Sequence, residues 1–207
     1  MRPDRLVVVL GTGTGVGKTW VASTILAGLR ESGLTVAARK PVQSYGPCDV
    51  DTDASALGLA TGEPAEEVCP RHRWYGMPMA PPMAAAFLGQ SLPMLGDLLA
   101  ELTWPAGIDV GIVETVGGPR SPLADDADSA AMATALDADL SLLVANAGLG
   151  AINAVRLSAP ACPQPLTVYL NRFDGGDLHD RNRRWLQAEG IDVVVDLAEL
   201  AGRLLAG

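Results

Sequence analysis

The residues whose chemistry is easiest to predict stand in a glycine-rich loop near the amino end of the chain. The loop runs from Gly11 to Thr19 and directly follows an apolar run. A phosphate needs several backbone N–H groups aimed at it, which glycines allow, and the positive end of a following helix adds attraction. Lys18 would reach the β- and γ-phosphates of a nucleotide, and the Thr19 hydroxyl would bind Mg²⁺. The residues predicted to hold the nucleotide here are Gly13, Thr14, Gly15, Val16, Gly17, Lys18 and Thr19.

The spacing of this loop departs from the common nucleotide-binding pattern. That pattern has a glycine, four residues and then Gly-Lys-Ser/Thr, whereas five residues separate Gly11 from Gly17. The alternative interpretation is a glycine-rich turn that binds no ligand. A strand, a loop and a helix are all predicted around it, so we favour the phosphate site.

Two carboxylates and one further cation are candidates to complete the site. Mg²⁺ prefers oxygen ligands, and Glu114 ends an apolar run at a strand end, where ligands gather in open parallel sheets. Asp53 fits two interpretations equally, a second metal ligand or a helix cap. Lys40 closes another expected strand just before Pro41, either as an ordinary strand-end charge or as a phosphate-binding cation. Its position on the expected phosphate side favours the second interpretation.

The chain of 207 residues predicts one α/β domain over residues 1–207, with a mostly parallel sheet and helices on both faces. With 48% hydrophobic and 19% charged residues, it can bury a substantial core. Strands are expected at Arg5–Leu10, Thr35–Lys40, Asp109–Glu114, Leu140–Ala145, Leu166–Leu170 and Ile191–Val195. Helices are expected at Thr19–Glu31, Thr52–Ala60, Leu92–Leu102, Ala127–Leu136, Ala151–Leu157 and Asp180–Glu189. A Pro- and Met-rich stretch from Tyr75 to Ala84 predicts either a surface connection that enters a helix near Pro82 or a wall of a substrate site.

Composition and charge argue against several classes of partner. A net charge of −9 opposes attraction to a nucleic-acid backbone. Neither a membrane-spanning apolar run nor a signal-peptide pattern is evident, so we expect a cytoplasmic protein without a membrane partner. Cys48, Cys69 and Cys162 form no paired motif and are interpreted as inert thiols. His72 and His179 are interpreted as solvated or hydrogen-bonded rather than catalytic.

Taken together, the motifs resemble those of the dethiobiotin synthetase family. The resemblance covers most of the chain, and the five-residue gap of the loop is the family's own spacing. The remaining pieces are Lys40-Pro41-Val42-Gln43-Ser44, Thr52-Asp53-Ala54, Met79-Ala80-Pro81-Pro82, Val113-Glu114 with Gly117-Gly118, and Gly148-Leu149-Gly150-Ala151-Ile152-Asn153.

This resemblance implies a P-loop fold and an ATP-dependent reaction of 7,8-diaminononanoate with CO₂ that gives dethiobiotin, ADP and phosphate. One amine captures CO₂ as a carbamate, the carbamate attacks the γ-phosphate, and the second amine closes the ring. The implied roles are Mg²⁺ binding by Thr19, Asp53 and Glu114, neutralisation of the γ-phosphate and the carbamate by Lys18 and Lys40, a diamine site at Thr14 and Ser44, and adenine recognition by Asn171. The family is a homodimer with interfacial sites, which implies that Gly150, Ala151, Ile152 and Asn153 bind the substrate carboxylate across the interface.

Two departures from the family pattern bear on the substrates. Thr115 and Val116 stand where the family has Gly-Ala. These bulkier residues predict either a narrower substrate pocket or a backbone that cannot adopt a positive φ. The alternative of a related enzyme that carboxylates another amine therefore stays open. The segment from Ile191 to Ala198 lacks a clear counterpart of the family's base-enclosing Leu-Gly-x-Ile-Pro. This predicts relaxed base selectivity, with Arg172 either contacting the base or lying at the surface.

The alternative from another functional class is a nucleotide-switched partitioning or delivery ATPase. Such proteins carry a second lysine near the start of the loop, where this chain has Gly11 to Gly13. No amphipathic terminal helix is evident either, which would attach such a protein to a membrane. Both observations favour the enzyme.

Overall fold

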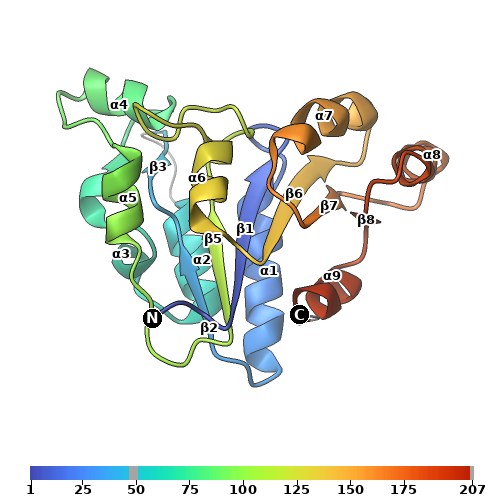
Figure 1. Ribbon diagram of the computed structural model, residues 1–207, viewed down its shortest axis with the longest axis horizontal. Coiled ribbons are helices and arrows are strands. Elements are labelled where there is room, and N and C mark those ends of the chain that lie inside the picture. Colours follow the sequence, from blue (N-terminus) through green and yellow to red (C-terminus); the bar gives the residue numbers. More distant parts are fainter. Residues whose placement is uncertain (47–50, 206–207) are drawn as a thin grey trace.

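A six-stranded parallel sheet forms the centre of the computed structural model, which describes residues 1–46 and 51–205 (Figure 1). The strands lie in the order β2-β5-β1-β6-β7-β8, and every neighbouring pair is parallel. The predicted α/β fold with a mostly parallel sheet is therefore confirmed. The strands are β1 (Arg5–Gly11), β2 (Val36–Arg39), β5 (Val110–Glu114), β6 (Leu140–Asn146), β7 (Leu166–Asn171) and β8 (Val193–Val194).

Helices cover both faces of this sheet because each strand turns alternate side chains to opposite sides. On β1, Val7 and Val9 belong to one apolar core with α1, α2 and α9, whereas Val8 and Leu10 belong to the other with α6, α7 and α8. The first group of helices comprises α1 (Lys18–Glu31), α2 (Asp53–Thr61) and α9 (Leu197–Leu205). The second comprises α6 (Ser129–Leu136), α7 (Ala151–Ser158) and α8 (Asp177–Ala188).

A smaller apolar layer lies beyond the β2 edge of the sheet (Figure 1). Tyr75, Leu98 and Met132 are buried in its core. Its elements are the paired strands β3 (Gln43–Ser44) and β4 (Trp74–Tyr75) and the helices α4 (Pro81–Phe87) and α5 (Leu95–Glu101). The short helix α3 (Ala65–Val68) instead packs with α2 in the first core, through Val68. Two short 3-10 helices, η1 (Arg71–Arg73) and η2 (Ala159–Ala161), complete the described elements.

Helix α9 is the main element that the sequence did not predict. Leu200 and Leu204 are fully buried on one side of it and pack on α1, while Leu205 is 51% exposed. The expectation that the chain lacks an amphipathic terminal helix is therefore wrong, and the apolar side of this helix is used inside the fold. Other corrections are smaller, since α5 begins at Leu95 rather than Leu92 and α8 at Asp177 rather than Asp180. Among the described helices, none is long and apolar enough to cross a membrane.

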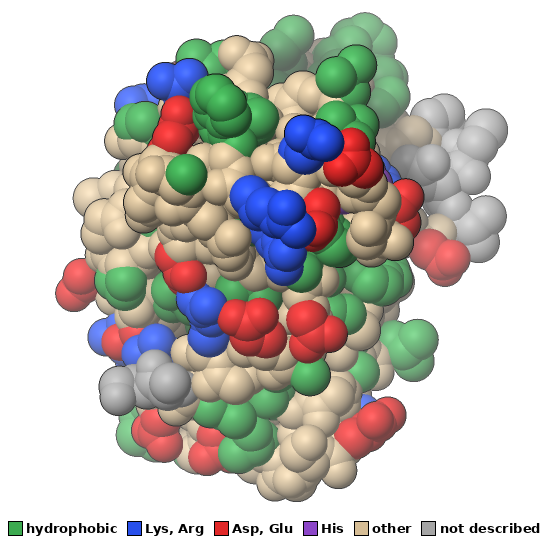
Figure 2. All heavy atoms as spheres, turned by 90° about the vertical axis from the view of Figure 1, so that its right-hand side faces the viewer, with side chains coloured by type: hydrophobic (Ala, Val, Ile, Leu, Met, Phe, Trp, Pro, Cys, Tyr) green, Lys and Arg blue, Asp and Glu red, His purple; other side chains and the backbone are tan. Residues whose placement is uncertain are grey.

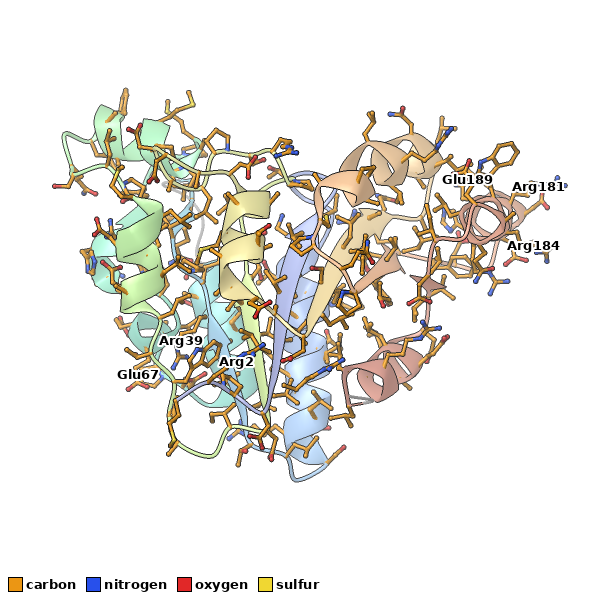
Figure 3. The ribbon with its side chains drawn as sticks, in the orientation of Figure 1. Arg2, Arg39, Glu67, Arg181, Arg184 and Glu189 are labelled. Carbon is orange, nitrogen blue, oxygen red and sulfur yellow. The ribbon has the colours of Figure 1, made fainter. Side chains whose placement is uncertain are left out.

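The edge strand β2 is anchored by the buried side chain of Arg39 (Figure 3). Its Nη1 lies 2.7 Å from Glu63 Oε1, its Nε donates to Thr103 O at 2.6 Å, and its Cζ lies 4.9 Å from the centre of the Trp104 ring. A buried guanidinium needs such partners because its charge is otherwise costly to desolvate. The next residue, Lys40, is fixed through its own N–H, which donates to Val68 O at 2.8 Å.

Helix α8 carries charged side chains on the face shown in Figure 2, where basic and acidic groups lie next to one another. Arg181 and Arg184 point away from the sheet (Figure 3) and pair within the helix, Arg181 with Asp177 at 2.7 Å and Arg184 with Asp180 at 2.8 Å. Oppositely charged side chains four residues apart support a surface helix. The basic groups of this helix are thus compensated locally.

Candidate active site

The carboxyl ends of β1, β2 and β5 open into a cavity of about 530 Å³. This is the edge at which ligands bind in open parallel sheets. Nine of the predicted site residues line the cavity together with part of the Pro- and Met-rich stretch, which is therefore a cavity wall as well as the entry to α4. The predicted residues that line it are Thr14, Gly15, Gly17, Lys18, Thr19, Lys40 and Ser44, together with the acidic residues Asp53 and Glu114.

The phosphate loop has the backbone geometry that its glycines predict. Gly17 has a φ of 96°, in the left-handed region that side chains disfavour. A Cβ there would lie 2.1 Å from Asn171 Nδ2, so both the angle and the space require glycine. Lys18 begins α1, and its Nζ donates to Gly13 O at 3.1 Å and Gly117 O at 3.0 Å.

Lys18 is an electrostatically disfavoured cation. Burial lowers the pKa of its ammonium to about 8, with the charge of Lys40 acting in the same direction and Glu114 and Asp53 opposing it. A phosphate placed beside this ammonium would favour its charged form. The side chain is therefore prepared for an anionic ligand.

Thr19 connects the two acidic side chains. Its Oγ1 lies 2.8 Å from Asp53 Oδ1 and 2.9 Å from Glu114 Oε1, close enough to donate to either. The cap of α2 is Thr52, whose side chain accepts from Ser55 N at 3.2 Å. Of the two interpretations of Asp53, the helix cap is thus wrong, and its carboxylate faces the cavity.

Lys40 is a buried cation between the same two carboxylates, not an ordinary strand-end charge. Its Nζ donates to Glu114 Oε1 at 2.6 Å, to Asp53 Oδ2 at 2.7 Å and to Thr115 O at 3.1 Å. Burial disfavours its charge, yet the attraction of Asp53 and Glu114 outweighs burial and raises the pKa of Lys40. Lys40 in turn lowers the pKa of Asp53, whereas burial raises the pKa of Glu114 against the pull of Lys40.

The oxygens of Thr19, Asp53 and Glu114 suit Mg²⁺ in chemistry and spacing. Neighbouring ligands of an octahedral Mg²⁺ lie about 2.9 Å apart, given metal–oxygen distances of about 2.0–2.1 Å, and Thr19 Oγ1 is 2.8 Å and 2.9 Å from the two carboxylate oxygens. Glu114 Oε2 is buried and has no hydrogen-bond partner within the described part of the chain. No group of three or more His, Cys, Asp and Glu side chains among the described residues could hold a metal. Phosphate and water oxygens would therefore complete the shell.

Thr115 and Val116 differ in their relation to the cavity. The Thr115 side chain is fully buried, and its Oγ1 donates to Val9 O at 3.0 Å, so it points into the sheet. Val116 lines the cavity. Neither residue has a positive φ, which occurs instead at Gly117 with 53°. The expected obstruction by Thr115 and the expected conflict with a positive φ are thus wrong, and of the two side chains only that of Val116 borders the cavity.

Ser44 is the predicted diamine-site residue on β3. Its Oγ donates to Met79 O at 2.6 Å, which joins β3 to the cavity wall. Gly117 and Ser121 line the same cavity and were not singled out from the sequence. The Gly-Gly pair after Glu114 was the only sequence signal for Gly117, and no signal pointed to Ser121.

A second cavity of about 510 Å³ lies on the other side of the phosphate loop, where Asn171 ends β7. Asn171 Nδ2 donates to Val16 O at 2.8 Å, and its Oδ1 accepts from Arg172 N at 2.9 Å. Nδ2 retains a second hydrogen and Oδ1 a second lone pair, and both could bond to a nucleotide base. Arg172 Nη2 donates to Gly15 O at 3.0 Å, so this exposed residue braces the loop. The lining residues are Gly17, Trp20, Tyr169, Asn171, Arg172, Phe173 and Val195.

Two residues that line this second cavity were not expected there from the sequence. Val195 lines it, so the segment after Ile191 does reach the site although it lacks the family's pattern. Trp20, which is 54% exposed, was not singled out from the sequence because a tryptophan in the first turn of a helix is commonly a packing residue.

The predicted carboxylate-binding residues at the start of α7 lie elsewhere in the chain. Gly150, Ile152 and Asn153 line a separate cavity of about 560 Å³ and are not among the residues of the first one. Ala151 is buried. One chain alone does not bring this set to the phosphate loop, and its role across an interface stays a prediction.

The histidines and the described cysteines lie outside both nucleotide-side cavities. His72 Nε2 is 3.1 Å from Glu101 Oε1, and His179 Nδ1 is 2.8 Å from Asp174 Oδ1. Cys69 and Cys162 are buried free thiols, and burial raises their pKa values to about 12 and about 11. Cys48 lies outside the described residues.

Comparison with known proteins identifies the family. A family model described as AAA domain matches residues 5–189. The ATP-dependent dethiobiotin synthetase of Anaeromyxobacter dehalogenans is 36% identical over 159 residues, which are 76% of this chain and 70% of that protein. The chain belongs to the dethiobiotin synthetase family. The resemblance seen in the sequence motifs is thereby confirmed.

Two further members of the family show the same relation. The ATP-dependent enzyme of Caulobacter vibrioides is 41% identical over 149 residues, which are 69% of this chain and 66% of that protein. That of Mycobacterium bovis is 35% identical and covers 75% of this chain and 68% of its own. The matched part thus spans about two thirds of each relative, slightly less for the Caulobacter protein.

Solved structures confirm the P-loop type of fold for this dethiobiotin synthetase family member. A plasmid partition protein from Borrelia burgdorferi covers 99% of this chain and 97% of its own, with a TM-score of 0.56 and 14% identity. The cell division protein FtsY of Thermotoga maritima covers 100% of this chain and 69% of its own, with a TM-score of 0.52 and 15% identity. At these identities the likeness concerns the fold alone.

Proposed function

We propose that this chain is an ATP-dependent cyclo-ligase that joins 7,8-diaminononanoate and CO₂ into dethiobiotin and releases ADP and phosphate. The observation that carries the proposal is the meeting of Lys18, Thr19, Lys40, Asp53 and Glu114 around one cavity, in a member of the dethiobiotin synthetase family. The curated relatives are named ATP-dependent dethiobiotin synthetases. No comparable support favours a nucleotide-switched partitioning role.

The residues around the cavity suit a reaction whose stages concentrate negative charge. One free amine adds to CO₂ as a carbamate, the carbamate oxygen attacks the γ-phosphorus and displaces ADP, and the second amine attacks the carbamoyl carbon and expels phosphate. Lys18 and Lys40 would neutralise the carbamate and the transferred phosphoryl oxygens, while loop N–H groups orient the phosphates. Thr14, Ser44 and Val116 would border the diamine.

Mg²⁺ belongs to the proposal, and Thr19, Asp53 and Glu114 would hold it. Bound there, it would supply positive charge to the β- and γ-phosphate oxygens. The distances from Thr19 Oγ1 to Asp53 Oδ1 and Glu114 Oε1, 2.8 Å and 2.9 Å, support this assignment. Asn171 and Trp20 would contact the base at the second cavity.

A homodimer completes the proposed assembly, with the start of α7 reaching the site of the partner subunit. The helix begins at Gly150, whose φ of 90° suits a glycine-dependent start, and a helix amino end attracts carboxylates. Leu149, just before this helix, and Leu157, on it, are 93% and 74% exposed, which fits a surface that a second copy covers. The cytoplasmic location and the lack of nucleic-acid and membrane partners stay predictions.

The decisive experiment measures product and phosphate release with purified protein, 7,8-diaminononanoate, bicarbonate, Mg²⁺ and ATP. A cyclic urea in the mass spectrum with diamine-stimulated phosphate release supports the proposal. Stimulation by another amine alone would show that Val116 and its neighbours select a different substrate. Phosphate release that no amine stimulates would refute the ligase.

Two variants test the assigned residues in the same assay. Lys18→Ala should lose at least about 10²-fold in turnover because it removes a preorganised phosphate cation, and Glu114→Gln should raise the Mg²⁺ concentration needed for half-maximal turnover. Arg181→Ala is a matched control, since this arginine is 75% exposed and pairs only with Asp177 in the described contacts. Parental turnover in Lys18→Ala would refute the phosphate-site assignment.

A further inference from the structure

The ammonium of Lys40 bonds to the same carboxylates that the proposed metal site needs. Its Nζ is 2.6 Å from Glu114 Oε1 and 2.7 Å from Asp53 Oδ2, and the side chain is only 2% exposed. Thr19 Oγ1 holds the other Asp53 oxygen at 2.8 Å and shares Glu114 Oε1 at 2.9 Å. Of the four carboxylate oxygens, only Glu114 Oε2 has no partner among the described residues.

This arrangement makes the lysine and a divalent cation competitors. Two cations that share carboxylate oxygens repel each other strongly, since charge interactions are weakly screened away from water. The buried Lys40 side chain is tied to a third acceptor as well, Thr115 O at 3.1 Å. Lys40 thus offsets one of the two carboxylate charges and Lys18, which also interacts with both carboxylates, offsets the other, so added negative charge is needed before a further cation is favoured.

We propose that Lys40 is an internal counter-ion that suppresses metal binding to Asp53 and Glu114 until a nucleotide's phosphates add negative charge. The inference rests on the proposed Mg²⁺ site. It assigns Lys40 a positioning role toward the metal, in addition to its contact with reacting groups. The metal then binds tightly only together with the nucleotide, and the order of binding is set by an ion pair within the protein.

Lys18 provides a comparison within the same cavity. It also carries a buried ammonium, but its Nζ donates to the carbonyl oxygens of Gly13 and Gly117 at 3.1 Å and 3.0 Å. Removing Lys18 lowers the positive charge nearby without freeing a carboxylate oxygen. The two lysines therefore separate direct competition from a general effect of charge.

The test measures Mn²⁺ binding by electron paramagnetic resonance and calorimetry with no nucleotide present. Lys40→Met should bind Mn²⁺ at least about tenfold more tightly than the parent because it frees two carboxylate oxygens from a cation. Lys40→Arg, which keeps the charge, should show no gain, and Lys18→Met should gain less than Lys40→Met. Adding Glu114→Gln to Lys40→Met should abolish the gain, which locates the ion.

The parent protein gives an independent measurement should Lys40→Met not fold. A metal that binds the folded state raises Tm. Because Lys40 suppresses metal binding when no nucleotide is present, millimolar MnCl₂ alone should leave the Tm of the parent unchanged. A rise in Tm that Glu114→Gln removes would overturn the inference, as would equal Mn²⁺ affinities of folded Lys40→Met and the parent. These readouts involve no amine, so absence of ligase activity would refute the proposed reaction without touching them.

Discussion

Thr115→Ala should destabilise the protein while leaving the reaction almost unchanged. Thr115 stands beside the proposed metal ligand Glu114, where the family has glycine, so its sequence position suggests an effect on the substrate. The structure places its side chain on the opposite side of the chain from the cavity, with Oγ1 donating to Val9 O at 3.0 Å. The contact that alanine removes is thus a contact of the sheet.

The magnitude follows from two losses. The hydrogen bond contributes about 1 kcal/mol, because Val9 O keeps its bond from Thr115 N and is not left unpaired. The buried methyl group contributes about 1 kcal/mol more through lost burial and the small cavity left behind. Thr115→Ala should therefore lower the free energy of unfolding by about 2 kcal/mol and Tm by about 4–8 °C for a chain of this size. Thr115→Val keeps the volume and should lose about 1 kcal/mol.

Urea unfolding and steady-state kinetics with varied diamine distinguish the two interpretations. We expect kcat/KM for the diamine to stay within about threefold in both Thr115 variants. Val116→Ala is the positive control because Val116 lines the cavity. It should change kcat/KM for the diamine about tenfold. The reasoning fails if Thr115→Ala shifts the KM for the diamine as much as Val116→Ala does while its stability stays that of the parent.

Two further predictions concern the core. Leu204→Ala should lower the free energy of unfolding in urea by at least about 2 kcal/mol, because Leu204 is fully buried on α9. Leu205→Ala changes a neighbour that is 51% exposed and should stay within about 0.5 kcal/mol of the parent. Equal losses in the two variants would show that α9 does not pack on the core. The pKa values of Cys69 and Cys162, raised to about 12 and about 11 from 9.0, mean that the folded state keeps these thiol protons when the unfolded state loses them. Their stabilisation is complete below pH 9 and is lost as pH rises toward 11 and 12, so each should cost about 1 kcal/mol at pH 10 relative to pH 8. Urea unfolding of Cys69→Ala at both pH values checks this, and an alkaline loss as large as in the parent would contradict it.

The sequence predicted the sheet and the phosphate loop because both depend on local patterns. Runs of Val and Leu with turn residues between them define buried parallel strands, and all six expected strands form. The glycines of the loop are required by backbone angle and by space, as at Gly17, which is why their spacing is informative. Glu114 and Lys40 followed from their places at strand ends, since the parallel sheet brings those ends to one edge.

The remaining features depend on contacts that local patterns do not encode. Thr52 and Asp53 are adjacent and both suit a helix cap, and only the tertiary contact of Asp53 with Lys40 and Thr19 distinguishes them. Helix α9 was missed because Leu200 and Leu204 are also compatible with a short apolar tail. Their helical arrangement becomes evident only from their packing on α1. The orientation of Thr115 depends on its pairing with Val9 of the neighbouring strand, which no spacing within the chain could show.

The charge balance of the cavity explains how an acidic chain can be built to hold a polyphosphate. The sequence of net charge −9 contains only two lysines, Lys18 and Lys40, and both are buried here opposite Asp53 and Glu114. Two cations and two anions cancel, which lowers the cost of burying them in the folded protein. A nucleotide that arrives with a divalent ion adds its negative charge together with compensating positive charge. Local pairing, not the overall charge of the surface, therefore sets the affinity of this site for anions.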